Sequence, residues 1–271
     1  MKRVFLLLTL YLGIACGADA SIDTVSVYSK SMAKEIKCVV ITPSAYSEKS
    51  RRFPVVYLLH GAHGNFSNWV TRVPGMQQLA DENQLMIVCP DGNPNSWYFD
   101  SPVDSAARYE TYIATDVPTY IDASYRTLAD RQHRAISGLS MGGHGAMFIA
   151  FRHADIFGAC GSMSGALDVS LIPKGYGLDK ILGDVKTNAS FYKDWSVINV
   201  IEKYPGDSLA IIIDCGTQDI LSFINRTVHQ KMMKLGIPHE YIERPGRHDW
   251  VYWSKAVRYQ LLFFREYFQK Q

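Results

Sequence analysis

Short apolar runs recur along the chain and alternate with longer segments of mixed polarity. The runs that favour β-strands cover residues 36–40, 55–59, 85–89, 134–136, 159–162, 209–214 and 240–243. Several are apolar at every position, which is typical of central strands covered on both faces. The segments between them that favour helices cover residues 76–83, 109–125, 143–151, 220–234 and 254–268. This alternation predicts an α/β fold with a mostly parallel central sheet and helices on both faces.

Residues 21–271 are predicted to form a single domain. It has no internal repeat, no low-complexity tract and no linker rich in glycine and serine. Residues 166–208 interrupt the alternation of strands and helices. We expect them to form an insertion of short helices over the edge of the sheet where the strands end.

Residues 1–20 have the composition of an export signal. Lys2 and Arg3 precede an apolar run over residues 4–14, and residues 18–20 offer a small-x-small cleavage site. The run is too short to span a bilayer, and no later segment resembles a transmembrane helix. We therefore expect an exported protein, periplasmic or secreted. Lipid attachment at Cys16 is the less favoured alternative, because Gly13 occupies the position where a leucine is expected.

Charge and cysteine content limit the possible partners. The formal charge of +2 falls to +1 when the signal is removed, since that segment carries two basic residues and one acidic residue. A near-neutral surface gives no support for nucleic acid or an anionic membrane. The four remaining cysteines, Cys38, Cys89, Cys160 and Cys215, allow three disulfide pairings. Cys89 and Cys215 end apolar runs, which favours buried thiols, and no C-x-x-C pair suggests zinc.

The most informative motif is Gly-Leu-Ser-Met-Gly at residues 138–142. It follows a predicted strand and precedes a predicted helix, so it predicts a sharp turn that exposes the hydroxyl of Ser140 as a nucleophile. The alternative is that Ser140 only caps the helix. A serine nucleophile needs a histidine base held by a carboxylate, and in this arrangement the chain order is nucleophile, acid, histidine.

Three histidines follow at a suitable distance. His229 falls within a predicted helix and His239 starts a strand, whereas His248 follows a strand and a turn. The loops after the carboxyl ends of parallel strands carry the sites of open α/β sheets, so we favour His248 as the base.

The acid has three candidates. Asp219 follows a strand by a short loop and lies on the same predicted rim as His248. Asp214 ends that strand and is expected to point into a helix-packed face. Asp249 is the chain neighbour of the histidine and is poorly placed to face its ring. We favour Asp219.

When a serine attacks an ester, the carbonyl oxygen becomes negatively charged. Backbone N–H groups directed at this oxyanion are needed to stabilise it. Met141, directly after the nucleophile, is expected to supply one, and Ala62 in the glycine-containing loop at residues 60–64 the other. Glycines such as Gly61 let this loop approach the substrate. His60 and His63 are weak evidence for a metal without a nearby carboxylate, so we expect no metal and no cofactor.

With these residues in place, the chain resembles the esterase D-like, tributyrin esterase branch of the α/β-hydrolases. Matching stretches lie at residues 56–61, 138–143, 214–219 and 245–250 and span nearly the whole mature chain. The resemblance implies carboxylic ester hydrolysis with the triad and donors above. Residues 96–101 are similar to a segment that borders the acyl pocket of tributyrin esterases. Arg247 departs from the pattern, because many relatives have a second glycine there.

The substrate is less well defined. Gly61, Trp97, Tyr98 and Trp250 are predicted to bind it, although the aromatic side chains are equally consistent with ordinary packing. Export fits poorly with S-formylglutathione and favours an extracytoplasmic ester, a small molecule or an acetyl or feruloyl group on a plant polysaccharide. An acyltransferase with a sugar or alcohol acceptor and a non-catalytic carbohydrate-binding relative are the alternatives. The oligomeric state is left open.

Overall fold

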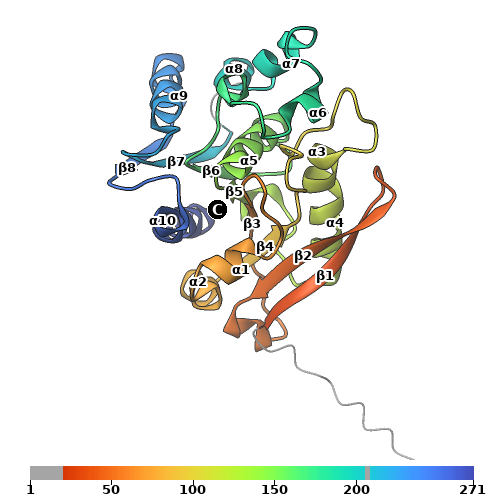
Figure 1. Cartoon of the computed structure of the whole chain (residues 1–271). Helices are drawn as coiled ribbons and strands as arrows, with labels where there is room; N and C mark the ends of the chain where they lie inside the picture. The colour runs from red at the N-terminus through yellow and green to blue at the C-terminus, as the bar shows by residue number, and fades with distance from the viewer. Residues whose placement is uncertain (1–20, 205–207) are drawn as a thin grey trace, which may run out of the picture.

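The computed structural model describes residues 21–204 and 208–271, and its strands form one twisted sheet (Figure 1). The predictions of a signal peptide and of lipid attachment at Cys16 fall outside the described residues. The strands are β1 (Ser21–Ser29), β2 (Lys34–Thr42), β3 (Val55–Leu59), β4 (Met86–Pro90), β5 (Arg134–Gly138), β6 (Ala159–Met163), β7 (Ala210–Gly216) and β8 (Glu240–Arg244). Their order across the sheet is β1-β2-β4-β3-β5-β6-β7-β8.

The strands from β4 to β8 are parallel, whereas β1 and β2 are antiparallel to their neighbours. The seven predicted strands are confirmed. Strand β1 was not predicted, because it is mostly exposed and lacks a continuous apolar run. It is held by antiparallel pairing with β2, from Ser21 opposite Thr42 to Ser29 opposite Lys34.

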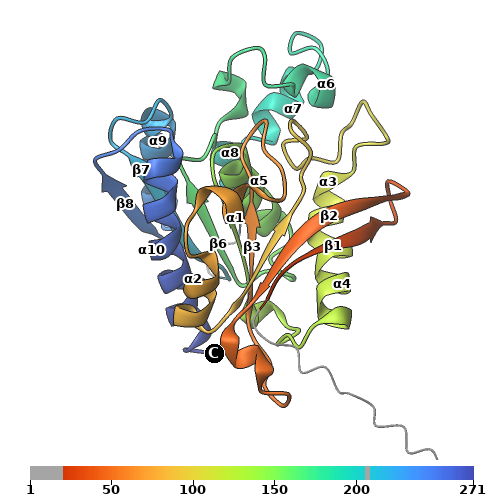
Figure 2. The same cartoon turned by 60° about the horizontal axis from the view of Figure 1, so that its bottom comes forward.

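Helices cover both faces of the sheet, as predicted (Figures 1 and 2). Their bounds are α1 (Asn68–Arg72), α2 (Met76–Asn83), α3 (Tyr109–Thr111), α4 (Val117–Ser124), α5 (Met141–Arg152), α6 (Leu178–Leu182), α7 (Ala189–Asp194), α8 (Val197–Val200), α9 (Ser222–Leu235) and α10 (Trp250–Phe268). The apolar side chains of α2 and α10 pack in one core layer, and those of α4, α5 and α9 in the other. Alternate residues of the central strands, such as Val56 and Tyr57, face the two layers.

Two predicted helices have different limits in the structure. A turn of π-helix over Tyr112–Asp116 divides the segment predicted at residues 109–125 into α3 and α4. Helix α10 begins four residues before the predicted start, because the Asp249 carboxylate accepts a hydrogen bond from the N–H of Tyr252 at 3.0 Å and caps the helix.

The insertion carries short helices, as expected. Helices α6, α7 and α8 lie above the sheet in Figure 2, at the end where the parallel strands finish. The imidazole of His144 on α5 hydrogen bonds through Nε2 to the carbonyl of Trp195 at 3.0 Å. Burial lowers the pKa of His144 to about 3, so this ring stays neutral and donates to the insertion.

The four cysteines after residue 20 are all buried and free in the structure. Within the part of the chain that the structure describes, no helix combines the length and apolar character needed to cross a bilayer.

Candidate active site

The turn between β5 and α5 gives Ser140 an unusual backbone. Its φ is 55° and its ψ is −116°, a strained conformation for a residue with a side chain. A Cβ on Gly142 would lie 2.5 Å from the carbonyl oxygen of His60, and one on Gly138 would lie 2.5 Å from the backbone of Gly142. The two glycines of the motif are therefore required because β3, β5 and α5 approach one another too closely for side chains.

Three side chains from separate loops meet at this turn. The hydroxyl of Ser140 and Nε2 of His248 are 2.9 Å apart, and Nδ1 of His248 is 3.0 Å from each carboxylate oxygen of Asp219. The carboxylate is buried and also accepts the N–H of Leu221 at 2.8 Å. The order hydroxyl, imidazole and carboxylate allows the histidine to accept the serine proton while the carboxylate fixes its tautomer.

The other acid candidates have different partners. Asp214 is fully buried, where it forms an ion pair with Arg244 and accepts a hydrogen bond from the hydroxyl of Tyr252. Asp249 caps α10 as described above. Neither carboxylate hydrogen bonds to the ring of His248.

The other histidine candidates lie together elsewhere. Nδ1 of His229 is 2.8 Å from Nε2 of His239, and the ring of His229 stacks on Tyr241 with centroids 4.1 Å apart. His229 lies on α9 and His239 directly before β8, and neither ring hydrogen bonds to Ser140.

The loop after β3 lies beside the nucleophile, since a Cβ on Gly61 would be 3.4 Å from the Cβ of Ser140. The N–H of His63 is bonded to the carbonyl of Pro94 and that of Gly64 to the carbonyl of Gly61. Among residues 21–204 and 208–271, the N–H groups of Ala62 and Met141 have no hydrogen-bond partner. Both groups are therefore available to a negatively charged oxygen beside Ser140.

The side chain of His60 holds this loop in place through hydrogen bonds. Its Nε2 accepts the N–H of Gly92 at 2.8 Å, so its Nδ1 carries the proton and donates to the carbonyl of Gly61 at 2.8 Å. Burial lowers the pKa of His60, which keeps the ring neutral. The carbonyl of His60 accepts the hydroxyl of Tyr98 at 2.9 Å. Both ring nitrogens are occupied, so His60 is a structural residue of the loop.

Trp97 and Tyr98 are enclosed by protein, with 2% and 0% of their surfaces exposed. Trp97 donates its indole N–H to the carbonyl of Tyr176 at 2.8 Å, and Tyr98 supports His60. This burial argues against the predicted direct contacts with substrate, because the ring of Trp97 packs against His144 and that of Tyr98 against His60. Trp250 is half-buried and stays a predicted contact. Its ring meets Trp69 edge to face, with centroids 5.4 Å apart.

Two features beside the triad were not predicted. The ring of Trp253 meets that of His248 edge to face at 4.9 Å and restrains the imidazole. Ile220 and Val251, one residue after Asp219 and three after His248, are 75% and 72% exposed. They give the loop of the acid and the first turn of α10 an apolar outer surface. No sequence signal distinguished Trp253 from the other aromatic residues of α10.

In the described part of the chain, no group of three or more histidine, cysteine, aspartate or glutamate side chains could hold a metal ion.

The sheet order, the helices on both faces and the strained serine turn define an α/β-hydrolase fold. The chain matches the family model described as "Putative esterase" over residues 29–264. It belongs to this esterase family and is a carboxylic ester hydrolase.

Individual relatives agree with this assignment. An acetyl esterase of Caldicellulosiruptor saccharolyticus is 25% identical over 256 residues, covering 88% of this chain and 95% of the relative. Esterase Rv1288 of Mycobacterium tuberculosis is 27% identical over 235 residues, which cover 77% of this chain but only 51% of the relative. The solved structure of a ferulic acid esterase is 31% identical, with a TM-score of 0.79, covering 92% of this chain and 99% of that chain.

Proposed function

We propose that the chain hydrolyses carboxylic esters through a triad of Ser140, His248 and Asp219. The observation that carries this proposal is the unbroken series of hydrogen bonds from hydroxyl to imidazole to carboxylate. An acyl-enzyme mechanism requires such a series, because the hydroxyl is a weak nucleophile until a base removes its proton.

In the proposed first step, Ser140 attacks the ester carbonyl and Nε2 of His248 takes the hydroxyl proton. Asp219 stabilises the resulting imidazolium, and the N–H groups of Ala62 and Met141 bind the oxyanion. The imidazolium then protonates the departing alcohol as the acyl-enzyme forms. In the second step His248 takes a proton from water, and the resulting hydroxide attacks the acyl carbonyl. The bond between this carbon and Ser140 Oγ then breaks, His248 returns the proton to Oγ, and the acid is released.

We propose an acetyl or feruloyl ester of a carbohydrate as the substrate, outside the cytoplasm. The relatives named acetyl esterase and ferulic acid esterase support the acyl group. The half-buried Trp250 offers an aromatic surface, and the exposed Ile220 and Val251 offer apolar area beside the triad. Export rests on the sequence pattern of residues 1–20 alone.

Fluorophosphonate labelling combined with an ester screen tests the proposal. We expect a fluorophosphonate probe to label the wild-type protein and not Ser140→Ala. We also expect hydrolysis of p-nitrophenyl acetate and methyl ferulate by the wild type only. Undiminished labelling of Ser140→Ala would exclude Ser140 as the nucleophile.

A further inference from the structure

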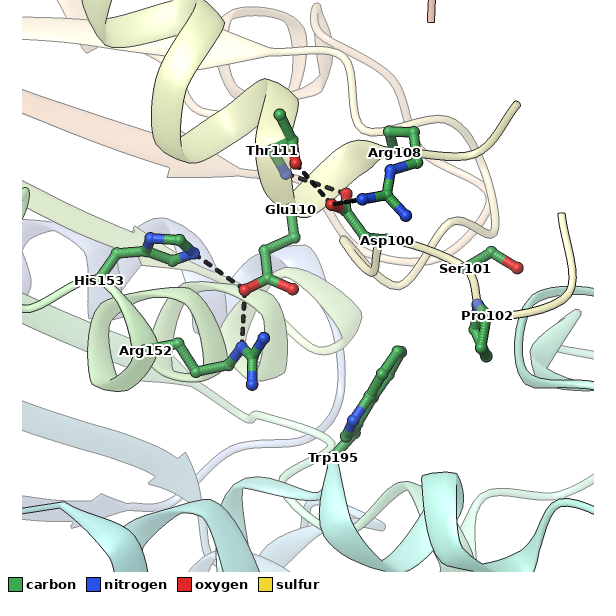
Figure 3. A pocket seen from close by; sticks show the side chains of 9 residues that line it. All are labelled: Asp100, Ser101, Pro102, Arg108, Glu110, Thr111, Arg152, His153 and Trp195. Atoms are coloured by element: carbon green, nitrogen blue, oxygen red, sulfur yellow. Dashed lines mark hydrogen bonds and ion pairs between the residues drawn. The ribbon is translucent and has the colours of Figure 1, made fainter. Parts of the chain in front are cut away.

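A pocket lies away from the candidate active site, between the segment that leads into α3, the end of α5 and the end of α7 (Figure 3). Its volume is about 440 Å³. Ser140 and Arg152 stand at opposite ends of the twelve-residue helix α5, so the pocket is about 18 Å from the nucleophile along the helix axis. It is therefore separate from the site that would bind the ester.

The charges on the pocket wall compensate one another. Arg108 pairs with Asp100 at 2.9 Å, and Arg152 pairs with Glu110 at 2.6 Å. His153 adds a second donor to Glu110 at 2.9 Å. Burial raises the pKa of Glu110, but the hydrogen bonds from His153 and Arg152 outweigh it and lower the pKa, so the carboxylate stays ionised. With two carboxylates and two guanidinium groups in the wall, the pocket does not select a charged ligand.

Polar atoms nevertheless remain available inside the pocket. Glu110 is only 5% exposed, and the hydrogen bonds from Arg152 and His153 both end on its Oε1. Within the described chain Oε2 has no hydrogen-bond partner, and it is not completely enclosed by protein. It therefore faces the pocket (Figure 3). Arg152 uses only Nε for its pair, which leaves its terminal nitrogens as donors. The pocket therefore offers both hydrogen-bond acceptors and donors. The hydroxyl groups of a ligand need both, because each can donate and accept.

The indole of Trp195 stands across the pocket from Glu110 (Figure 3). Phe99 and Phe191 hold the ring, with centroids 5.2 and 5.1 Å away. A fixed aromatic face suits the apolar C–H face of a pyranose ring, and its preorganisation lowers the entropic cost of binding. A neutral wall, paired donors and acceptors and one flat apolar surface match a neutral sugar better than an ion or a wholly apolar ligand.

We propose that this pocket binds a neutral pyranose unit of a polysaccharide chain at a distance from the ester that is cleaved. The polysaccharide as natural ligand rests on the proposed function. Binding itself does not require catalysis, so the two ideas can fail separately.

Titration calorimetry with unesterified xylohexaose tests the pocket. The wild-type protein is first treated with a fluorophosphonate to block the candidate active site. We expect saturable binding that Trp195→Phe and Arg152→Gln each weaken about fivefold or more, the loss that separates a contributing residue from a nearly neutral one. Thermal melting of each variant verifies that it is folded, and Trp195→Phe keeps an aromatic ring against Phe99 and Phe191.

Arg226→Gln is the matched control. Arg226 is 46% exposed and pairs through Nε with Glu243 at 2.6 Å, whereas Arg152 is 45% exposed and pairs through Nε with Glu110 at the same distance. We expect Arg226→Gln to bind xylohexaose as the wild type does. Absence of saturable binding, equal binding by all variants, or tighter binding of hexagalacturonate than of xylohexaose would each overturn the proposal. Loss of ester hydrolysis with xylohexaose binding intact would instead overturn the proposed function alone.

Discussion

Replacing the Asp219 carboxylate by an amide should disable the proposed base with little change in the fold. The carboxylate accepts His248 Nδ1–H through two oxygens, each at 3.0 Å, and one of these oxygens also accepts the Leu221 N–H at 2.8 Å. The amide of Asp219→Asn has a single oxygen. If that oxygen keeps Leu221, the amide N–H₂ faces Nδ1, which must then become an acceptor.

The ring of His248 would then carry its proton on Nε2, the atom 2.9 Å from the hydroxyl of Ser140. A protonated Nε2 cannot take the hydroxyl proton. The opposite amide orientation places the N–H₂ group against the Leu221 N–H, which leaves a buried donor unpaired at a cost of about 1–3 kcal/mol. We therefore expect kcat to fall roughly 10⁴-fold, about 5 kcal/mol in the activation barrier, with KM nearly unchanged.

The assay is steady-state hydrolysis of p-nitrophenyl acetate, with the melting temperature measured on the same samples. Asp249→Asn is the control, because asparagine caps a helix as well as aspartate and the cap of α10 is retained. Its kcat should stay within about twofold of wild type, which corresponds to a change of well under 1 kcal/mol in the activation free energy. If Asp249→Asn loses activity and Asp219→Asn keeps it, the assignment of the acid is wrong.

Three further outcomes follow from the geometry. Tyr98→Phe removes the buried bond to the His60 carbonyl, so unfolding in urea should show a loss of about 1–3 kcal/mol, with a lower kcat. Glu110→Gln removes a carboxylate whose pKa is lowered on folding. That carboxylate stabilises the protein above its unfolded pKa and loses this effect in acid, so the deficit of the variant in thermal melting should shrink as the pH falls from 7 to 3. Ester hydrolysis should be unchanged by EDTA, since the proposed mechanism uses protein groups alone; a rate lost to EDTA and restored by zinc would contradict it.

Most strands of the fold were predictable because they are buried on both faces and therefore read as continuous apolar runs. Strand β1 was not, since its side chains are largely exposed and its place depends on pairing with β2. The approach of Ser140, Asp219 and His248 was predictable because chain order and position after a strand limit the candidates to a few residues. Their catalytic roles are still proposals.

The surroundings of the aromatic residues could not be predicted from the sequence. Trp97 and Tyr98 have positive φ angles of 56° and 59°, and this backbone turns both rings into the interior. A local sequence rule cannot predict such a backbone, because surrounding packing imposes it. The position of Trp253 against His248 likewise depends on where α10 lies relative to β8. The pocket at Trp195 combines residues separated by up to 95 positions, from Asp100 to Trp195.

The order of strands explains why the loops of the acid and the histidine must act together. Strands β5 and β8 are three positions apart in the sheet, about 14 Å at the usual spacing, yet Ser140 and His248 are in contact. The loop after β8 must therefore reach back across β7. The N–H of Gln218 donates to the carbonyl of Gly246 at 3.0 Å, and a Cβ on Gly216 would lie 2.4 Å from that same oxygen. These contacts join the two loops into one unit, so the imidazole reaches the serine supported by the loop that carries Asp219.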